Sequence, residues 1–523
     1  MPHNNLFGPN LKHDIPAGLV VFLVALPLCL GIALASGAPL ISGVIAGVIG
    51  GLVVGPLSGS QLSVSGPAAG LTVIVLGAIA TLGSFEAFLT AVVLAGCIQI
   101  ALGYARAGLI GYYFPAAVIK GMLAGIGVIL VLKQIPHALG FDQSSMGSVA
   151  FGEKHNANTF TELWRALTTA HTGALLIALS SLLILVLWEN KKLKQFGVFK
   201  FIPGPLVVVV ISTLLNELFM AIAPTLALSN VQLVNIPQLF GDEANHVQVG
   251  PDWRALGQLA TWTLAATMAI VASLESLLSL EASDKLDPYK RNSPPNRELK
   301  AQGVGNVLSG LLGGLPITAV IVRSSANVTA GARTRVAAIA HGFFMAGFVL
   351  LTPKLLNHIP LAGLASILIF IGYKLSSVSL YRGMYRLGWS QFMPFLITVL
   401  AIIFTNLLQG IAIGLVVALF FILRNNYRNA FVLQKGQDKD GGEILTLTLS
   451  QEVSYLNKGA IAKCLQEVPA NGFVVIDATT SNYIDHDVLE VLQDFKINAP
   501  SRNIHLTLIN IPDLPFANSA ATL

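Results

Sequence analysis

Two glycine- and proline-rich stretches contain the backbone groups best suited to bind an ion. They are SVSGPAAGLTV (63–73) and LLGGLPITAVIVRSSANVTAGARTR (311–335), and each interrupts an apolar region. Each predicts unwound backbone followed by a short helix, whose first N–H groups lack partners within the helix and carry partial positive charge. Two such helix ends facing one another would bind an anion. The alternative is that these glycines and prolines only allow membrane helices to pack closely.

Two charged residues inside apolar runs could complete such a site. Arg323 lies in the second stretch, and an arginine inside a membrane needs an acidic partner, a water-filled cavity or a bound anion. Alternatively, its side chain reaches the membrane surface beside Arg333 and Arg335. Glu275 and Ser279 are four residues apart, so a helix places both on one face. This pair could accept a proton or hold Na⁺ and so couple anion transport to a cation gradient; alternatively, Glu275 forms an ion pair with Arg323.

The elements that must position these residues are transmembrane helices. Of the 523 residues, 54% are hydrophobic and only 11% are charged, whereas soluble domains average about 25% charged residues. Apolar runs near the length of about 20 residues that a membrane helix needs recur from Pro16 to Leu423. About fourteen spans are expected, several of them short. They are placed near residues 16–36, 39–57, 67–82, 85–105, 116–133, 172–188, 204–224, 259–281, 301–314, 318–330, 336–352, 357–373, 391–408 and 410–423.

The two broken stretches fall in the third and tenth of these spans, which are corresponding positions of two seven-span halves. A pair of glycine- or proline-interrupted spans at corresponding positions is typical of the substrate site of a transporter built from inverted repeats. The predicted fold is therefore an all-α polytopic membrane protein.

The basic residues predict the orientation of the spans. The net charge of +5 could indicate a nucleic-acid partner, but lysines and arginines fall almost wholly in short segments between apolar runs. Short cytoplasmic loops are enriched in these residues, so we expect both termini in the cytoplasm, a location in the plasma membrane (bacterial inner membrane) and no nucleic-acid partner. The loops that carry them follow the even-numbered spans and contain Arg106; Lys191, Lys192 and Lys194; Lys285, Lys290, Arg291, Arg297 and Lys300; Arg333 and Arg335; Lys374, Arg382 and Arg386; and Arg424 and Arg428.

The C-terminal part changes character after Arg428. QKGQDKDGG predicts a linker over 429–442, and residues 443–512 predict a small cytoplasmic α/β domain with strands at 444–450, 472–479 and 503–510. Helices are expected at 457–467 and 486–495. We further expect residues 1–15 to form a cytoplasmic N-terminus, 16–428 the membrane domain, and 513–523 a disordered tail.

No sequence pattern supports an enzyme. Cys29, Cys97 and Cys464 lie far apart without metal-ligand spacing, and no GxSxG, HExxH or Walker-type motif occurs. We therefore expect neither catalytic residues nor a cofactor, and no metal apart from Na⁺ at Glu275 and Ser279.

The chain resembles the SulP family of sulfate-permease-like anion transporters. The resemblance implies two inverted seven-span repeats arranged as core and gate domains, an elevator-like movement, homodimers and a C-terminal STAS-like domain. It also implies that the starts of spans three and ten hold the anion, at Ala68 and Ala69 and at Ala319, Val320 and Ile321, with Arg323 nearby, and that Glu275 and Ser279 hold the cation. The matching segments are HDIPAGLVVFLVALPL, SVSGPAAGLTV, SLESLLSLEAS, ELKAQGVGNVLSGLLGGLPITAVIVRSSANVTAGARTRVAAI and VVIDATTSNYIDHDVLEVL.

Three positions depart from the family pattern. The first span reads ALPLCLGIALASG and lacks the usual polar Pro-Gln-Gly-type stretch, and Val320 and Ile321 replace small or hydroxylated residues. Backbone amides would then perform most of the anion recognition. His486 and Asp487 stand where related regulatory domains often carry a phosphorylatable serine, which argues against a phosphorylation switch there.

These observations predict a secondary active transporter of sulfate or bicarbonate, coupled to Na⁺ or H⁺. An anion exchanger, a uniporter or channel, a nucleobase permease of the same architecture and a membrane-anchored STAS sensor remain alternatives. The sequence does not choose between the two anions.

Overall fold

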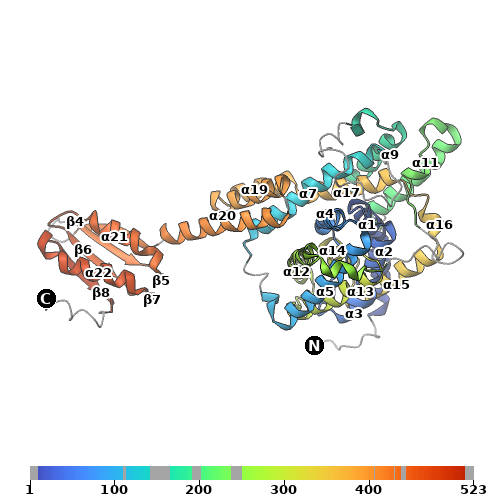
Figure 1. Ribbon diagram of the computed structural model, residues 1–523. Coiled ribbons are helices and arrows are strands. Elements are labelled where there is room, and N and C mark those ends of the chain that lie inside the picture. The colour runs from blue at the N-terminus through green and yellow to red at the C-terminus, as the bar shows by residue number, and fades with distance from the viewer. Residues whose placement is uncertain are drawn as a thin grey trace. The chain divides into compact units, whose positions relative to one another are not determined.

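The chain folds into two compact units in a computed structural model that describes residues 10–109, 114–141, 165–190, 202–236, 250–405, 407–428, 430–437 and 443–512. The first unit comprises Met1–Leu387 and Phe395–Gly414, and the second comprises Gly388–Pro394 and Leu415–Leu523 (Figure 1). The predicted tail, most of the predicted N-terminal segment and the basic residues Lys191, Lys192 and Lys194 lie outside the described residues.

The first half of the membrane region contains a helix at each of the seven predicted spans. The second of these helices continues without a break from α-helix into a π-helical turn and a short final turn, and the third begins as a strand. The elements are α1 (Leu11–Ala35), α2 (Leu40–Ile49) with η1 (Gly50–Val54) and α3 (Gly55–Leu57), β1 (Ser65–Pro67) with η2 (Ala69–Leu71) and α4 (Thr72–Leu82), α5 (Phe85–Tyr104), η3 (Ala107–Leu109), α7 (Ala116–Ala138), α9 (Thr172–Trp188) and α11 (Gly204–Ile222).

The second half repeats this pattern, including a strand before its third helix. Its elements are α12 (Leu259–Leu286), α13 (Pro295–Leu311), β2 (Ile317–Ala319) with α14 (Ile321–Thr329), α15 (Val336–Leu351), α16 (Pro353–Leu356), α17 (Leu361–Leu375), α18 (Val378–Arg386), α19 (Trp389–Phe404) and α20 (Leu407–Arg428). Short 3-10 turns, η5 (Pro224–Leu226), η6 (Asn230–Gln232) and η8 (Trp253–Gly257), lie between the halves.

These helices confirm the predicted all-α membrane fold. Within the described residues, eight helices are long and apolar enough to cross a membrane, and four shorter apolar helices accompany them. Several predicted boundaries were shifted by a few residues. Helix α1 begins at Leu11 rather than at 16, inside the predicted N-terminal segment 1–15. Helix α13 begins at Pro295 rather than at 301, because a proline is well accommodated in the first turn of a helix. Span ten begins as strand β2 and becomes helical only at Ile321.

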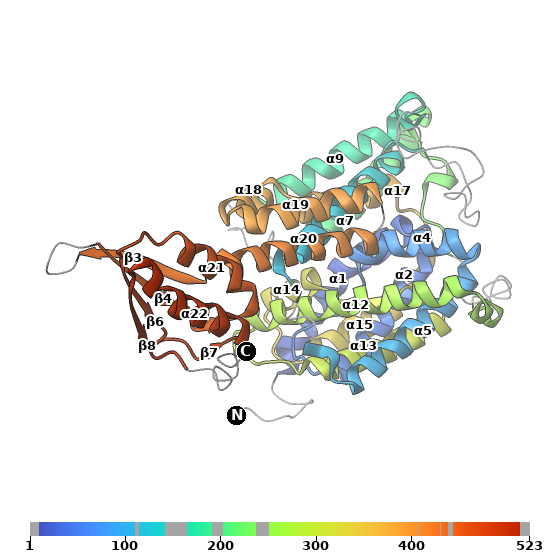
Figure 2. The ribbon, with the colours of Figure 1, turned by 60° about the vertical axis from the view of Figure 1, so that its left-hand side comes forward.

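The helices of the first unit form two groups, as predicted for a core and a gate. Helices α1, α2, α5 and α12–α15 pack together, and α7, α9, α11 and α17 form the other group (Figure 2). Glycines allow close approach in both groups. A Cβ atom on Gly96 of α5 would lie 2.6 Å from the Gly303 carbonyl oxygen of α13, and one on Gly127 of α7 would lie 2.6 Å from that of Gly372 on α17.

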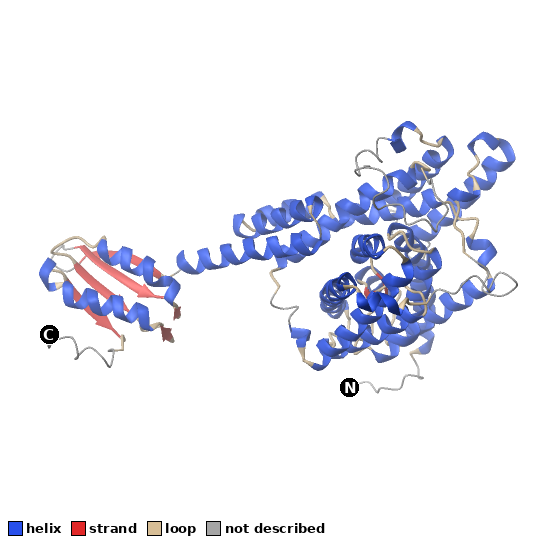
Figure 3. Ribbon diagram, viewed as in Figure 1, coloured by secondary structure: helices blue, strands red, loops and turns tan. Residues whose placement is uncertain are grey.

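The second unit contains a four-stranded sheet with two helices, as Figure 3 shows. The strand order is β3–β4–β6–β8; β3 and β4 are antiparallel, and the other pairs are parallel. The predicted linker 429–442 was wrong in part, because Phe431–Gln437 form strand β3. The elements are β3 (Phe431–Gln437), β4 (Glu443–Leu449), β5 (Glu452–Val453), η9 (Tyr455–Asn457), α21 (Lys458–Gln466), β6 (Phe473–Asp477), β7 (Tyr483–Ile484), α22 (His486–Asn498), η10 (Pro500–Arg502) and β8 (His505–Ile509).

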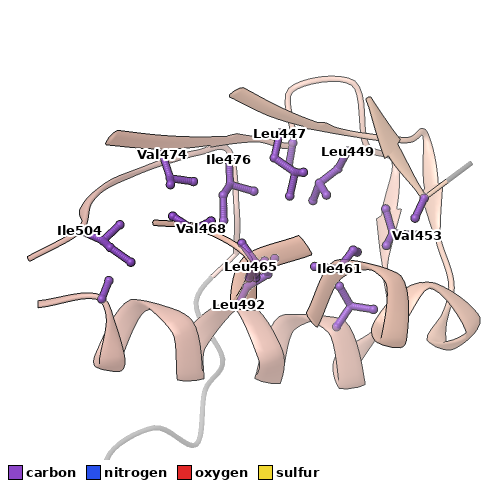
Figure 4. Packing of buried hydrophobic residues seen from close by; sticks show 14 residues of the cluster. Leu447, Leu449, Val453, Ile461, Leu465, Val468, Val474, Ile476, Leu492 and Ile504 are labelled. Carbon is purple, nitrogen blue, oxygen red and sulfur yellow. The ribbon is translucent and has the colours of Figure 1, made fainter. Parts of the chain in front are cut away.

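The core of this unit lies between one face of the sheet and its helices (Figure 4). Leu447 and Ile476 project from the sheet, and Ile461, Leu465 and Leu492 meet them from α21 and α22. All five side chains are at most 2% exposed, and each such burial stabilises the fold by about 1.5–3 kcal/mol. The predicted strands at 444–450, 472–479 and 503–510 and both predicted helices are confirmed.

Candidate ion-binding site

The two broken spans meet in a short antiparallel ladder inside the first unit. Ser65 pairs with Ala319, Gly66 with Thr318 and Pro67 with Ile317. Because the strands run in opposite directions, the helices that follow them begin at opposite ends of the ladder. The residues before these helices, Ala68 and Val320, both have extended backbone. The ladder therefore joins the two helix starts that the sequence predicted to form the anion site.

A buried polar network on α13 fixes this ladder. Asn306 donates from Nδ2 to the Ile317 carbonyl oxygen (3.0 Å) and to Gln99 Oε1 (2.6 Å), and its Oδ1 accepts the Ile317 N–H (2.5 Å). Gln302 donates from Nε2 to Ser65 Oγ at 2.7 Å. Sequence reasoning missed both residues. The sequence did contain a signal for them. Gln302 and Asn306 are four residues apart in the segment AQGVGNVLSG, so a helix places both amide side chains on one face.

Arg323 lies next to the ladder and is fully buried. Its Nη2 donates to the Pro67 carbonyl oxygen and contacts Cys29 Sγ, each at 3.3 Å, whereas Nε and Nη1 have no partner among the described residues. Complete burial excludes the alternative that this side chain reaches the membrane surface. A guanidinium with unpaired N–H groups at a helix start is suited to bind an oxyanion.

Gly66 makes this position of the guanidinium sterically feasible. A Cβ atom at residue 66 would lie 1.8 Å from Arg323 Nη1, which is inside the van der Waals contact distance. The glycine that the sequence marked as a helix breaker therefore also provides space for the arginine.

Glu275 lies at the start of the other half-helix. Its carboxylate accepts the Gly70 N–H, and a Cβ atom at Gly70 would lie 2.6 Å from Glu275 Oε2. Among the described residues, Oε2 has no hydrogen-bond partner, and Glu275 forms no ion pair with Arg323, so that alternative is also excluded. Ser279 is buried one turn further along α12. An unpaired carboxylate oxygen with a hydroxyl on the same face fits the oxygen ligands that Na⁺ requires.

The predicted anion-binding amides are only partly available. Ala319 donates its N–H to Ser276 Oγ (3.2 Å), and Val320 donates its N–H to the Val64 carbonyl oxygen (3.0 Å). These two amides are therefore used within the protein, contrary to expectation. Ala69 and Ile321 are the first residues of their helices, so their N–H groups have no acceptor within the helix. Both residues are only partly buried.

The fold and the site define a membrane transport protein built around two discontinuous helices. Residues 11–398 match the sulfate permease family. The chain therefore belongs to the sulfate permease family, which consists of membrane transporters and not of enzymes.

Two relatives show the range of this family. The chain is 29% identical over 422 residues to YvdB of Bacillus subtilis (strain 168), which carries the provisional name of a sulfate transporter; the match covers 80% of this chain and 75% of that protein. It is 27% identical over 466 residues to the bicarbonate transporter BicA of Picosynechococcus sp., covering 87% of this chain and 77% of that protein.

Solved structures show the same fold. The transmembrane domain of a cyanobacterial bicarbonate transporter BicA matches with a TM-score of 0.61 at 24% identity, covering 79% of this chain and 98% of that one. The murine solute carrier 26 family member A9 anion transporter in its inward-facing state matches with a TM-score of 0.74 at 17% identity, covering 97% and 86%. The second match includes most of the C-terminal unit, in agreement with the predicted STAS-like fold.

Proposed function

We propose that the protein is a secondary active transporter of a small inorganic anion, either sulfate or bicarbonate. The observation that carries this proposal is the buried guanidinium of Arg323, which has unpaired N–H groups beside the ladder that joins two helix starts. A positive side chain together with two helix N-termini favours an anion over a neutral substrate. The names of the relatives support both sulfate and bicarbonate.

The proposed coupling cation is either Na⁺, bound by Glu275 and Ser279, or a proton taken up by Glu275. Two hydrogen bonds support a link between this cation and the anion site: Gly70 donates to Glu275, and Ala319 donates to Ser276 on the same helix. A cation at Glu275 would therefore act on both helix starts at once. The anion site and the cation site would move together across the membrane in an elevator-like step.

The remaining parts of the proposal concern the assembly and its location. The protein would function as a homodimer in the plasma membrane, here a bacterial inner membrane, with both termini in the cytoplasm. The distribution of lysine and arginine between the spans supports this orientation.

Two other functions are less well supported. A nucleobase permease would need polar side chains at the helix starts, but Ala68, Ala69, Val320 and Ile321 offer none. A sensor would need its output in the C-terminal unit, whereas the paired broken helices lie in the membrane unit. An exchanger, uniporter or channel without cation coupling would leave Glu275 without a role.

The test is uptake of labelled sulfate and bicarbonate into proteoliposomes, with and without inward Na⁺ and proton gradients. We expect one gradient to stimulate uptake in the wild-type protein, and Glu275→Gln to abolish this stimulation. Glu281→Gln is the matched control, because Glu281 lies on the same helix but is exposed and pairs with Lys285 at 2.5 Å. Gradient-independent uptake that Glu275→Gln leaves unchanged would replace the proposal with an exchanger or uniporter.

A further inference from the structure

Cys29 is a fully buried thiol beside Arg323, and the proposed function gives it no role so far. Its Sγ accepts a hydrogen bond from Arg323 Nη2 at 3.3 Å and donates its own S–H to Met345 Sδ at 3.9 Å. The second contact takes up the S–H group, so the sulfur presents lone pairs to the guanidinium. The thiol is therefore a neutral, oriented acceptor for one guanidinium nitrogen.

A glycine on a third helix provides the space for the two sulfur atoms. A Cβ atom on Gly47 of α2 would lie 2.8 Å from Cys29 Sγ and 2.6 Å from Met345 Sδ. Met345 on α15 is also fully buried, and protein interiors are packed too densely for such side chains to shift freely. Helices α1, α2 and α15 therefore hold the Cys29 sulfur at a fixed place beside the guanidinium.

The acceptors of Arg323 carry no charge. Nη2 donates to Cys29 Sγ and to the Pro67 carbonyl oxygen, whereas Nε and Nη1 have no partner within the part of the chain that the structure describes. A carboxylate in place of the thiol would form a charge-assisted pair with the guanidinium and compete with an anion. A thiol is only a weak acceptor, so it holds the guanidinium and leaves its positive charge uncompensated.

Cys29 and Pro67 hold the same nitrogen from two separate elements. Pro67 belongs to β1 and pairs with Ile317 in the ladder, whereas Cys29 lies on α1. Because the guanidinium is planar and rigid, two acceptors on Nη2 also restrict the directions of Nε and Nη1. Without the thiol, the Pro67 carbonyl oxygen would be the one remaining acceptor of those that the structure shows for Arg323.

We propose that Cys29 is a positioning residue for anion recognition, which fixes the guanidinium of Arg323 against the ladder without neutralising its charge. The inference rests on the proposed function, in which Arg323 contacts the anion. A positioning role differs from space filling because it requires a hydrogen-bond acceptor at residue 29. It also requires that this acceptor be neutral.

The experiment compares the KM and the maximal rate of anion uptake into proteoliposomes for variants of the full-length protein. The probe is labelled sulfate or labelled bicarbonate, whichever the wild-type protein takes up. Cys29→Ala removes the acceptor and should raise the KM about fivefold, the effect of one hydrogen bond of ordinary strength, with little change in the maximal rate. Cys29→Ser restores an acceptor and should keep the KM close to the wild-type value. Cys97→Ala is the matched control, because this cysteine is exposed.

Cys29→Asp tests whether the acceptor must be neutral. Its carboxylate would pair with Arg323, so saturable uptake should be lost although residue 29 can still accept a hydrogen bond. The melting temperature of each variant shows whether it is folded.

Three results would overturn the inference. They are a wild-type KM in Cys29→Ala, an equal rise of the KM in Cys29→Ala and Cys29→Ser, as expected if the thiol only fills space, or wild-type uptake by Cys29→Asp. If Cys29→Ala does not fold, Cys29→Ser and Cys29→Asp still decide between the two roles. Absence of uptake of both anions by the wild-type protein would instead contradict the proposed function itself.

Discussion

Gly66 and Arg323 occupy the same small volume beside the ladder, so a substitution at one acts on the other. Because a Cβ atom at residue 66 would lie 1.8 Å from Arg323 Nη1, Gly66→Ala should displace the guanidinium and lower anion uptake at least about tenfold, a loss typical of misplaced binding groups. Gly77→Ala is the control from the same span, since nothing lies within 4 Å of its Cβ position. Wild-type uptake by Gly66→Ala would show that the guanidinium does not contact the anion.

Asn306 holds the backbone of Ile317 from both sides. Asn306→Ala leaves a buried N–H and a buried carbonyl oxygen without their partners, which should cost about 2–4 kcal/mol of stability. The melting temperature of the purified protein should fall by several degrees, and anion uptake should fall with it. Asn292→Ala, at an exposed loop position, should change neither. An unchanged melting temperature in Asn306→Ala would contradict the role given to this side chain.

The sequence could predict the charged members of this site but not its free amides. Arg323 and Glu275 stand out because charges are rare inside apolar runs. The amides of Ala319 and Val320 looked available because each lies at a helix start, yet Ser276 and Val64 accept them. These acceptors lie in other spans, and only the packing of spans three, eight and ten brings them close.

Asp14 connects the start of α1 to the segment between α14 and α15 by hydrogen bonds. This buried carboxylate at the start of α1 accepts the N–H groups of Arg333 (2.7 Å) and Thr334 (3.0 Å) and the Thr334 hydroxyl (2.5 Å), between α14 and α15. Asp14→Ala should therefore destabilise the protein by about 2–3 kcal/mol, the cost of leaving such donors unpaired. Thr334→Val should cost less, because both amides keep their acceptor. Thermal unfolding in detergent checks this order, and the reverse order would contradict it.

The positions of the membrane helices were predictable from the sequence, because each predicted span is a largely apolar run. Apolar runs predicted a helix at every span, because membrane helices satisfy their own backbone hydrogen bonds. Strand β3 was missed because Gln434 and Lys435 are polar and glycine, here Gly436, is uncommon in strands. These residues form a strand because they pair with β4. The π-helical turn Gly50–Val54 was also not expected; there Gly51 lies against Gly342 of α15.

At the scale of the whole molecule, a truncated protein can test whether anion uptake needs the part of the chain after Arg428. The chain ending at Arg428 retains the ladder, Arg323 and Glu275, and the part of the second unit that follows Arg428 has its own hydrophobic core. We expect this truncated protein to keep anion uptake per folded molecule within about threefold of the wild-type rate, because mutations in separate units act nearly independently. Uptake in proteoliposomes, normalised to folded protein, checks this. Complete loss of uptake in a folded truncation would favour a sensor or an obligatory regulatory domain.

The ladder between β1 and β2 also bears on how tightly the proposed anion site would bind on each side of the membrane. Because Ser65, Gly66 and Pro67 pair with the strand before α14, the two helix starts cannot separate without breaking backbone hydrogen bonds. In the proposed elevator-like step, the same groups would hold the anion whichever side of the membrane the site faces, so its dissociation constant should be equal on both sides. A difference in affinity between the two sides could not by itself concentrate the anion in any carrier. In the proposed symport, the concentration ratio would come from the electrochemical gradient of the coupled cation.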